Sequence, residues 1–435
     1  MIWVVVVFLF MLIIGAPIAF AFAFSSFVYI LTSPAISGES ISAVFYSSLD
    51  SFPLMAIPFF IFAGDLMVEG GISRKIIEFL RTIIGSVKGY LGTIAVITAV
   101  FFSAVSGSAV ATVAAVGSMM LPEMTKANYP KGYSASLVAT ASFLGFIIPP
   151  SIPMIMFGFL SNTSISELFI GGVVPGLILA ISFLVMHFFM VRKWKIEKHV
   201  ETDAAASVEK GEKLLRIWRT GRLAILALLM PVIVIGGIYA GIFTPTESAV
   251  VAVFYSILVG VVFYRQIKFG SFLSVAKKSA LNTAMIMITL VFATIFSRIL
   301  TIEKVPERVA DTILGISEQT WVVILIIVIF LLLVGMVMDA ITGVILATPI
   351  LFPIAVTQMG MDPVHFGVMM VVALAIGMIT PPMAMNIYLS AKIAGASIKD
   401  TFRYNIPFFI VSLVILFTIA FVPSLVTGLS AILSQ

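Results

Sequence analysis

The stretch Gly145-Phe-Ile-Ile-Pro-Pro-Ser-Ile-Pro153 lies inside an apolar run that is long enough to cross a bilayer, yet it contains three prolines. Proline lacks a backbone donor and clashes with the preceding helical turn, so the sequence predicts a broken helix here. The carbonyl groups freed near Ile147 and Ile148 need partners, because the bilayer core holds no water to bind them.

The same pattern recurs as Gly377-Met-Ile-Thr-Pro-Pro-Met-Ala-Met385. The glycine and the two adjacent prolines of the two stretches align at one constant offset along the chain. Interrupted apolar helices at matching positions of two halves point to a transporter binding site. We therefore expect the two broken helices to form the centre of the molecule.

Composition places the whole chain in a membrane. Of its 435 residues, 61% are hydrophobic and only 10% are charged, and the mean hydropathy is +1.20. A soluble protein of this size would carry about 25% charged residues. The sequence therefore predicts an all-α polytopic membrane protein within a lipid bilayer.

Several chemistries are excluded by the residues that are missing or scattered. Without cysteine, thiol catalysis, disulfides and cysteine-bound metal are ruled out. The three histidines have no carboxylate partner at ligand spacing, so we expect no metal other than Na⁺. No phosphate-binding glycine loop occurs, and no basic face suggests a nucleic-acid partner. We expect no catalytic residue, no enzyme activity and no organic cofactor.

Apolar segments divide the first half in a definite order. The first, from Ile2 to Leu31, is interpreted as one retained helix. The predicted elements that follow are a span from Phe52 to Glu69, an amphipathic segment over 70–88, a hairpin near 90–125, a broken helix over 133–160 and a span over 168–191. A hydrophilic segment over 192–222 and one further helix over 223–239 lead to the second half.

The second half repeats this order. Its predicted elements are spans over 246–264 and 280–300, an amphipathic connector over 301–317, a hairpin near 321–354, a broken helix over 366–392 and a last span over 406–422. We therefore predict two repeats, over 1–191 and 243–435, joined by a cytoplasmic segment and a connecting helix over 192–242. Weak internal similarity of this kind is typical of transporters.

Charge gives the predicted orientation. The segment 192–222 carries nine Lys/Arg and five acidic residues, so the positive-inside rule places it in the cytoplasm. Counting spans from there places the N-terminus in the cytoplasm and the C-terminus outside. The counts agree only if both hairpins are re-entrant, returning to the side from which they start. The two halves then have inverted topology.

The first hairpin carries small polar residues at its predicted tip, among them Ser103, Ser106 and Ser108. Small residues also serve ordinary helix packing in membranes. Together with the broken helix that follows, however, we favour a site for a cation and a substrate. Hydroxyl and carbonyl oxygens suit Na⁺, and helix N-termini favour a carboxylate.

Asp339 lies deep in an apolar stretch of the second hairpin. A carboxylate inside the membrane is costly and is a functional hypothesis by default. The alternative is a purely structural role, in which Asp339 caps the next helix. We favour function, because Thr342, Thr380 and Asn386 could supply neutral oxygens near it in the fold. Coupling to protons through Asp339 stays an open alternative to Na⁺.

In these motifs the chain resembles the large membrane subunit of TRAP transporters, the tripartite ATP-independent periplasmic family, of the DctM/SiaM type. The resemblance covers the whole chain and rests on motifs occurring together in order: Ile57-Pro-Phe-Phe-Ile-Phe-Ala-Gly64, Ser106-Gly-Ser108, Phe146-Ile-Ile-Pro-Pro-Ser151, Phe243-Thr-Pro-Thr-Glu-Ser248, Met338-Asp-Ala340 and Ile379-Thr-Pro-Pro382.

This resemblance implies a Na⁺-driven elevator-type transporter in the bacterial inner membrane. It would import an organic acid, such as sialic acid or a C4-dicarboxylate. The implied partners are a small four-helix membrane subunit and a periplasmic substrate-binding protein. The related alternative is a dicarboxylate carrier that works without a binding protein. A membrane-embedded enzyme or structural subunit is the alternative of another class, and the sequence offers it no acid–base or metal cluster.

The resemblance also implies two Na⁺ sites and one substrate site. The first Na⁺ site would use Ser103, Ser106, Gly145, Ile148 and Pro149. The second would use Gly335, Asp339, Thr342, Met378, Thr380 and Pro381. Substrate would contact Ser106, Ser108, Ser151, Asp339 and Asn386. Because Met383 stands where the first repeat has Ser151, the two repeats should contribute unequally to substrate binding.

Overall fold

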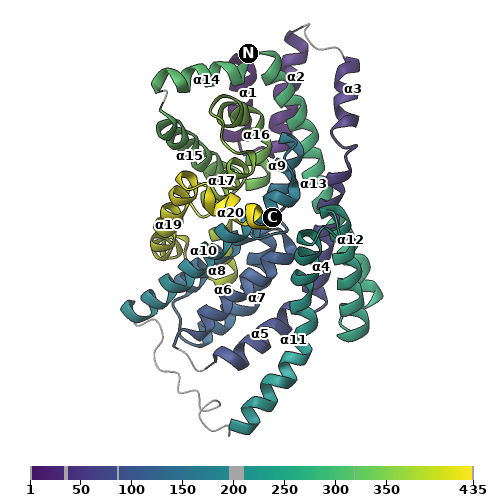
Figure 1. Ribbon diagram of the computed structural model, residues 1–435, viewed down its shortest axis with the longest axis vertical. Coiled ribbons are helices and arrows are strands. Elements are labelled where there is room, and N and C mark those ends of the chain that lie inside the picture. The colour runs from purple at the N-terminus through teal and green to yellow at the C-terminus, as the bar shows by residue number, and fades with distance from the viewer. Residues whose placement is uncertain (1, 34–37, 86–87, 195–209, 318, 434–435) are drawn as a thin grey trace.

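The structure, a computed structural model, describes the chain except residues 1, 34–37, 86–87, 195–209, 318 and 434–435. The described part consists of helices and connecting turns, without a strand (Figure 1). Seven of the described helices are long and apolar enough to cross a membrane. The predicted all-α polytopic membrane fold is confirmed.

In the first half, the hairpin of α6 and α7 is followed by the broken helix of α8 and α9, as predicted. The bounds are α1 Ile2–Ile13, α2 Ile18–Thr32, α3 Gly38–Ser47, α4 Ala56–Glu69, α5 Ile72–Ile84, α6 Tyr90–Ser106, α7 Ala109–Lys126, α8 Lys131–Phe143, α9 Ile152–Ser161 and α10 Ile165–Trp194. A short turn of 3₁₀-helix precedes α4, and another, Leu144–Phe146, follows α8.

The second half follows the same plan after a long connecting helix. The bounds are α11 Lys210–Tyr239, α12 Pro245–Ile257, α13 Phe269–Ile302, α14 Val305–Ile316, α15 Thr320–Val337, α16 Ala340–Phe352, α17 Pro363–Gly377, α18 Met385–Ala394, α19 Ile398–Phe421 and α20 Ser424–Leu433. Wider π-helical turns extend α12 over Leu258–Phe263 and α16 over Pro353–Gln358.

The predicted single span from Ile2 to Leu31 is wrong. The chain turns at Gly15, which has a φ of +75°, and α1 and α2 pack side by side. The rings of Phe8 and Phe22 lie 5.2 Å apart, which two collinear helices would not allow. Because the chain reverses at this turn, the N-terminus lies at the same end of the molecule as Thr32. A single span from Ile2 to Leu31 would have placed these two points at opposite ends. A 12-residue helix is also too short to span a bilayer.

Two further boundaries differ from the sequence prediction. The segment 192–222 is not one loop, because α11 begins at Lys210 and carries the basic residues from there to Arg222 as helix. Residues 195–209 of that segment lie outside the described part. After the last predicted span, the chain adds the short helix α20, which packs on α10 and α17. Ten residues were too few to predict it as a span.

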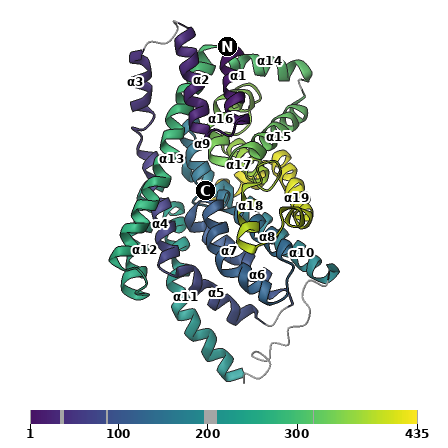
Figure 2. The ribbon, with the colours of Figure 1, turned by 180° about the vertical axis from the view of Figure 1, so that it is seen from behind.

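The two hairpins open toward opposite ends of the molecule. α6 and α7 point their open end toward the amphipathic helix α5, whereas α15 and α16 open toward α14 at the other end (Figures 1 and 2). This arrangement is what the charge pattern predicts. The inverted repeats, their boundaries at 191/192 and 242/243, and the elevator movement stay predictions.

The two halves interlock around the broken helices. α18 packs against α8 and α7, and α9 packs against α16, so each helix that follows a break touches the other half. The side chain of Asn405 on α19 joins three segments, because its amide donates to the Ile379 carbonyl at 2.8 Å and accepts from the Thr140 hydroxyl at 2.9 Å. All three groups are held away from water.

A separate set of helices flanks the first hairpin. α4 packs between α12 and α13. Asp65 lies in the second half of α4 and accepts from Lys278 and Ser279 on α13, at 2.8 Å each. The Asp65 side chain is only 10% exposed, so this pairing fixes α4 against α13 close to the hairpin tip.

Candidate functional site

The tip of the first hairpin turns on Gly107, between Ser106 and Ser108. Gly107 has a φ of +59°, which favours glycine. Ser108 is the N-cap of α7, accepting from the backbone of Ala111. The Ser106 hydroxyl lies 3.3 Å from that of Thr112 and 3.4 Å from the backbone nitrogen of Ser108. The expected serine-rich tip is therefore present, with its hydroxyls held within one turn.

This tip lies directly against the first break. The backbone nitrogen of Ile152 donates to the Gly107 carbonyl at 3.4 Å. A Cβ added at Gly107 would lie 2.8 Å from the Pro150 carbonyl oxygen, and one at Gly145 would lie 2.9 Å from that of Ser108. Only residues without a side chain let the two backbones approach this closely. The structure thus brings Gly145 to the hairpin tip.

Ser151 closes the first break. Its hydroxyl donates to the Phe146 carbonyl at 2.5 Å and accepts from the backbone of Met154, so it both satisfies a freed carbonyl and caps α9. Every residue from Phe143 to Gly158, including Ile148 and Pro149, is buried. The first break is therefore buried in the core of the molecule.

Ser103 stands apart from these satisfied groups. It is fully buried on the last turn of α6, and its hydroxyl has no hydrogen-bond partner among the described residues. An unpaired buried hydroxyl costs about 1–3 kcal/mol. The Ser103 oxygen lies one turn from the tip and has no hydrogen-bond partner among the described residues, so it is suited to coordinate a cation.

The tip of the second hairpin is built differently. Asp339 is the N-cap of α16 and accepts from the backbone nitrogens of Ile341 and Thr342 at 3.0 and 3.1 Å. The Thr342 hydroxyl donates to its other oxygen at 2.5 Å. The structural role considered for Asp339 is therefore present. Capping the helix does not remove the carboxylate from the tip, so the capping role and the functional hypothesis are compatible.

The second break also meets its hairpin backbone to backbone. A Cβ added at Gly377 would lie 2.5 Å from the Cα of Gly335, and one at Gly335 would lie 2.5 Å from the Leu374 carbonyl oxygen. The backbone nitrogen of Met383 donates to the Met336 carbonyl at 3.1 Å. Gly335 therefore lies against the end of α17, close to Met378.

The remaining predicted residues of the second half are arranged less compactly. The Thr380 hydroxyl, in the break, donates to the Ile376 carbonyl in the last turn of α17 at 3.0 Å. Pro381, Pro382 and Met383 are exposed, in contrast to the buried first break. The Asn386 amide points to the Ala139 carbonyl at 3.5 Å, and its oxygen is buried without a partner among the described residues. Among the described residues, no hydrogen bond joins Asn386 to Asp339.

A cavity of about 430 Å³ lies where both hairpin tips meet α4 and α13; we call it the tip pocket. Its lining includes Ser106, Ser108, Ile152 and Ile341 from the tips and the break. Three helices, α7, α9 and α16, begin at or beside this lining. Backbone nitrogens at helix N-termini attract anions, so the pocket can hold an acidic group.

The far wall of the tip pocket was missed by the sequence prediction. It is formed by Asp65 on α4 together with Lys278 and Asn282 on α13. The signal was present, because Asp65 and Lys278 are charges within or beside apolar segments. Their meeting was not predictable, since they lie 213 positions apart in the sequence.

Of the predicted substrate residues, Ser106 and Ser108 line the tip pocket directly, while Ser151 and Asp339 cap helices that begin beside it. Asn386 faces α8 instead. The residues predicted for each Na⁺ site lie around the place where a hairpin touches its broken helix. Whether these residues bind Na⁺ or substrate stays a prediction.

Paired hairpins, broken helices and a pocket at their meeting point are the architecture of a polytopic membrane transport protein. Comparison with known families makes this specific. Residues 5–425 match the family model described as the tripartite ATP-independent periplasmic transporter, DctM component. The chain belongs to this family, whose members are transporter subunits and not enzymes.

Curated relatives agree along nearly the whole chain. The isethionate TRAP transporter permease protein DctMQ of Oleidesulfovibrio alaskensis is 37% identical over 95% of this chain, which spans 64% of that longer protein. The C4-dicarboxylate TRAP transporter large permease protein DctM of Pseudomonas aeruginosa is 35% identical over 89% of this chain and 88% of its own length. The sialic acid TRAP transporter large permease protein SiaM of Vibrio cholerae is 32% identical over 94% and 93%.

Among solved structures, the YdaH transporter of Alcanivorax borkumensis has a similar fold. The superposition gives a TM-score of 0.61 and covers 88% of each chain at 14% sequence identity. At this identity the likeness concerns the fold alone.

Proposed function

We propose that this protein is the large permease subunit of a Na⁺-coupled importer of a small organic acid. The observation that carries the proposal is the tip pocket, a cavity of about 430 Å³. Ser106 at the end of α6 and Ser108 at the start of α7 line it together with Asp65 and Lys278. Ser106 and Ser108 would bind one carboxylate, together with backbone nitrogens of α7 and α9. The names of the relatives suggest a carboxylate or sulfonate anion as the substrate class.

The coupling ion is proposed from the charge of the caps. Ser108 and Ser151 are neutral caps, so the positive ends of α7 and α9 stay available to an anion. Asp339 is an anionic cap and offsets the positive end of α16, which suits a cation nearby. The unpaired hydroxyl of Ser103 supplies a further oxygen at the first tip.

The proposed partners follow from the family. The complex would lie in the bacterial inner membrane. A small membrane subunit would brace the helices around α4 and α13, and a periplasmic binding protein would deliver the organic acid to the permease. The hairpins and broken helices would then move together relative to α4 and α13, which is the elevator hypothesis.

Uptake into proteoliposomes tests this function. The permease, small subunit and binding protein would be reconstituted together, and uptake of succinate, isethionate and sialic acid would be measured. We expect uptake of one of these acids only with an inward Na⁺ gradient. Uptake at the same rate without Na⁺, driven by a proton gradient, would contradict the assignment. Uptake without the binding protein would favour the related single-component carriers.

Two variants connect this activity to the tip pocket. Ser106→Ala should lower the uptake rate at least tenfold, because it removes a hydroxyl from the pocket wall. Thr418→Ala is the matched control, since its hydroxyl is exposed and bonds only its own helix. Wild-type uptake by Ser106→Ala would remove Ser106 from the site.

A further inference from the structure

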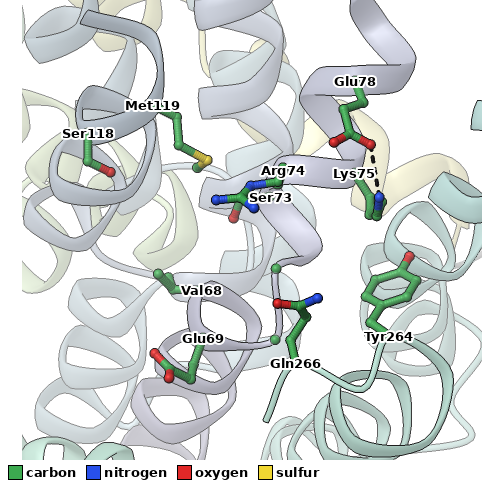
Figure 3. Close-up of a pocket in the computed structure, with 12 residues that line it drawn as sticks. Val68, Glu69, Ser73, Arg74, Lys75, Glu78, Ser118, Met119, Tyr264 and Gln266 are labelled. Atoms are coloured by element: carbon green, nitrogen blue, oxygen red, sulfur yellow. Dashed lines mark hydrogen bonds and ion pairs between the residues drawn. The ribbon is translucent and has the colours of Figure 1, made fainter. Parts of the chain in front are cut away.

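A second cavity follows the tip pocket along the same two helices. It has a volume of about 330 Å³ and lies at the turn between α4 and α5 (Figure 3); we call it the α5 pocket. α4 contributes Ile61 and Asp65 to the tip pocket and Glu69 to the α5 pocket. α7 contributes Ala114 to the first and Ser118 to the second.

These residues recur at helical spacing. Side chains three or four positions apart lie on one face of a helix, so each helix lines both cavities with a single face. On α7 that face is open, because Ala114 and Ser118 are exposed whereas the three residues between them are buried. The two cavities therefore follow one another along the same faces of α4 and α7, and we call this succession the groove between α4 and α7.

The α5 pocket holds two polar groups without a partner. The Arg74 side chain is exposed and makes no hydrogen bond or ion pair among the described residues. The Ser73 hydroxyl belongs to a residue only 2% exposed and also has no partner there. Both line the cavity, and in Figure 3 they lie on the same side of it.

The other charges of the α5 pocket do not neutralise Arg74. Lys75 is paired with Glu78 at 2.9 Å. The remaining acid, Glu69, lies well apart from Arg74 in Figure 3. The free guanidinium has several donors in a fixed planar fork, which matches the two oxygens of a carboxylate or sulfonate.

We propose that the groove between α4 and α7 is the route by which the transported anion leaves the tip pocket for the cytoplasm, and that Arg74 and Ser73 bind it transiently at the exit. This inference rests on the proposed function. The positive-inside rule supports a cytoplasmic exit, because Arg74, Lys75, Arg81 and Lys88 cluster at this end. A weak site there lets the anion leave the tip pocket before it is released.

Thiol modification tests the anion site without relying on transport. The chain contains no cysteine, so Ser118→Cys places a single thiol in the α5 pocket. Its reaction rate would be measured in inside-out vesicles with an anionic reagent, sulfonatoethyl methanethiosulfonate, and a cationic one, trimethylammonioethyl methanethiosulfonate. We expect Arg74→Gln to lower the anionic-to-cationic rate ratio by roughly threefold or more, and Arg74→Lys to preserve it.

A thiol at Ser274→Cys is the matched control. Ser274 is exposed on α13 and lines neither cavity, so its rate ratio should not change with Arg74→Gln. An unchanged ratio at Ser118→Cys would overturn the anion site. This readout holds even if the reconstituted wild type takes up no organic acid, so it fails separately from the proposed function.

Transport kinetics test the route. In the full reconstituted complex, Arg74→Gln should lower the maximal uptake rate of the transported acid several-fold, with little change in the concentration giving half-maximal uptake outside. Lys88→Gln removes an exposed cation of the same basic segment outside the cavity and should behave as wild type. A changed thiol ratio combined with a wild-type uptake rate would overturn the exit route.

Discussion

Single cap residues give the two hairpin tips opposite electrostatic character. Ser108 and Ser151 start α7 and α9 with neutral hydroxyls. Asp339 starts α16 with a carboxylate that accepts from two backbone nitrogens and one hydroxyl. A neutral cap leaves the positive end of its helix uncompensated, whereas a carboxylate cap offsets it.

Substitution of Asp339 separates its two roles. Asp339→Asn keeps an acceptor for the α16 backbone and removes the charge, whereas Asp339→Ala removes both. We expect only the alanine variant to lose about 1 kcal/mol of helix-cap stability, seen as a lower melting temperature in detergent. Both variants should lose Na⁺-dependent uptake. Wild-type uptake by Asp339→Asn would show that the residue acts as a cap alone.

At the scale of elements, glycines allow each hairpin to touch its broken helix through backbone atoms. Gly107 and Gly145 do so in the first half, and Gly335 and Gly377 in the second. These contacts leave no space for a side chain, so each hairpin and its break form one packed unit. Such units are the natural bodies for the proposed movement.

A methyl group at Gly377 should disturb this packing. We expect Gly377→Ala to lower stability by about 1–3 kcal/mol, because its Cβ would overlap the backbone of Gly335. The measurement is the temperature at which the detergent-solubilised protein loses monodispersity in size-exclusion chromatography. Gly236→Ala is the control, since Gly236 lies in α11 with nothing within 4 Å of its added Cβ. If both variants lost monodispersity at the same temperature, the tight contact between α15 and α17 would be contradicted.

At the scale of the whole molecule, the two hairpins enter from opposite ends and the helices beyond their breaks cross into the other half (Figure 2). The tip pocket forms only because these distant segments meet. The N-terminal hairpin of α1 and α2 packs on α13, where Phe8 and Phe22 contact Phe296.

Thiol labelling of intact cells tests this topology. Single cysteines would be introduced as Glu307→Cys on α14, Lys193→Cys at the end of α10 and Trp3→Cys on α1. We expect a membrane-impermeant maleimide to label the Glu307 and Trp3 variants from outside, because α14 and the N-terminus lie at the same end of the molecule (Figure 1). The Lys193 variant should react only after lysis. Labelling of Trp3→Cys only after lysis would restore the single first span.

Hydropathy, prolines and Lys/Arg positions were enough to predict the class of fold, because these local properties decide how each segment inserts into a bilayer. The sequence located both breaks and both hairpin tips, and it identified the family. It misread α1 and α2, since a turn at Gly15 leaves the hydropathy of the run unchanged. The sequence did not predict that Asp65 pairs with Lys278, that Asn386 faces α8, or that α4 and α7 line two cavities in succession. These depend on contacts between segments far apart in the chain, for which no single stretch of sequence carries a signal.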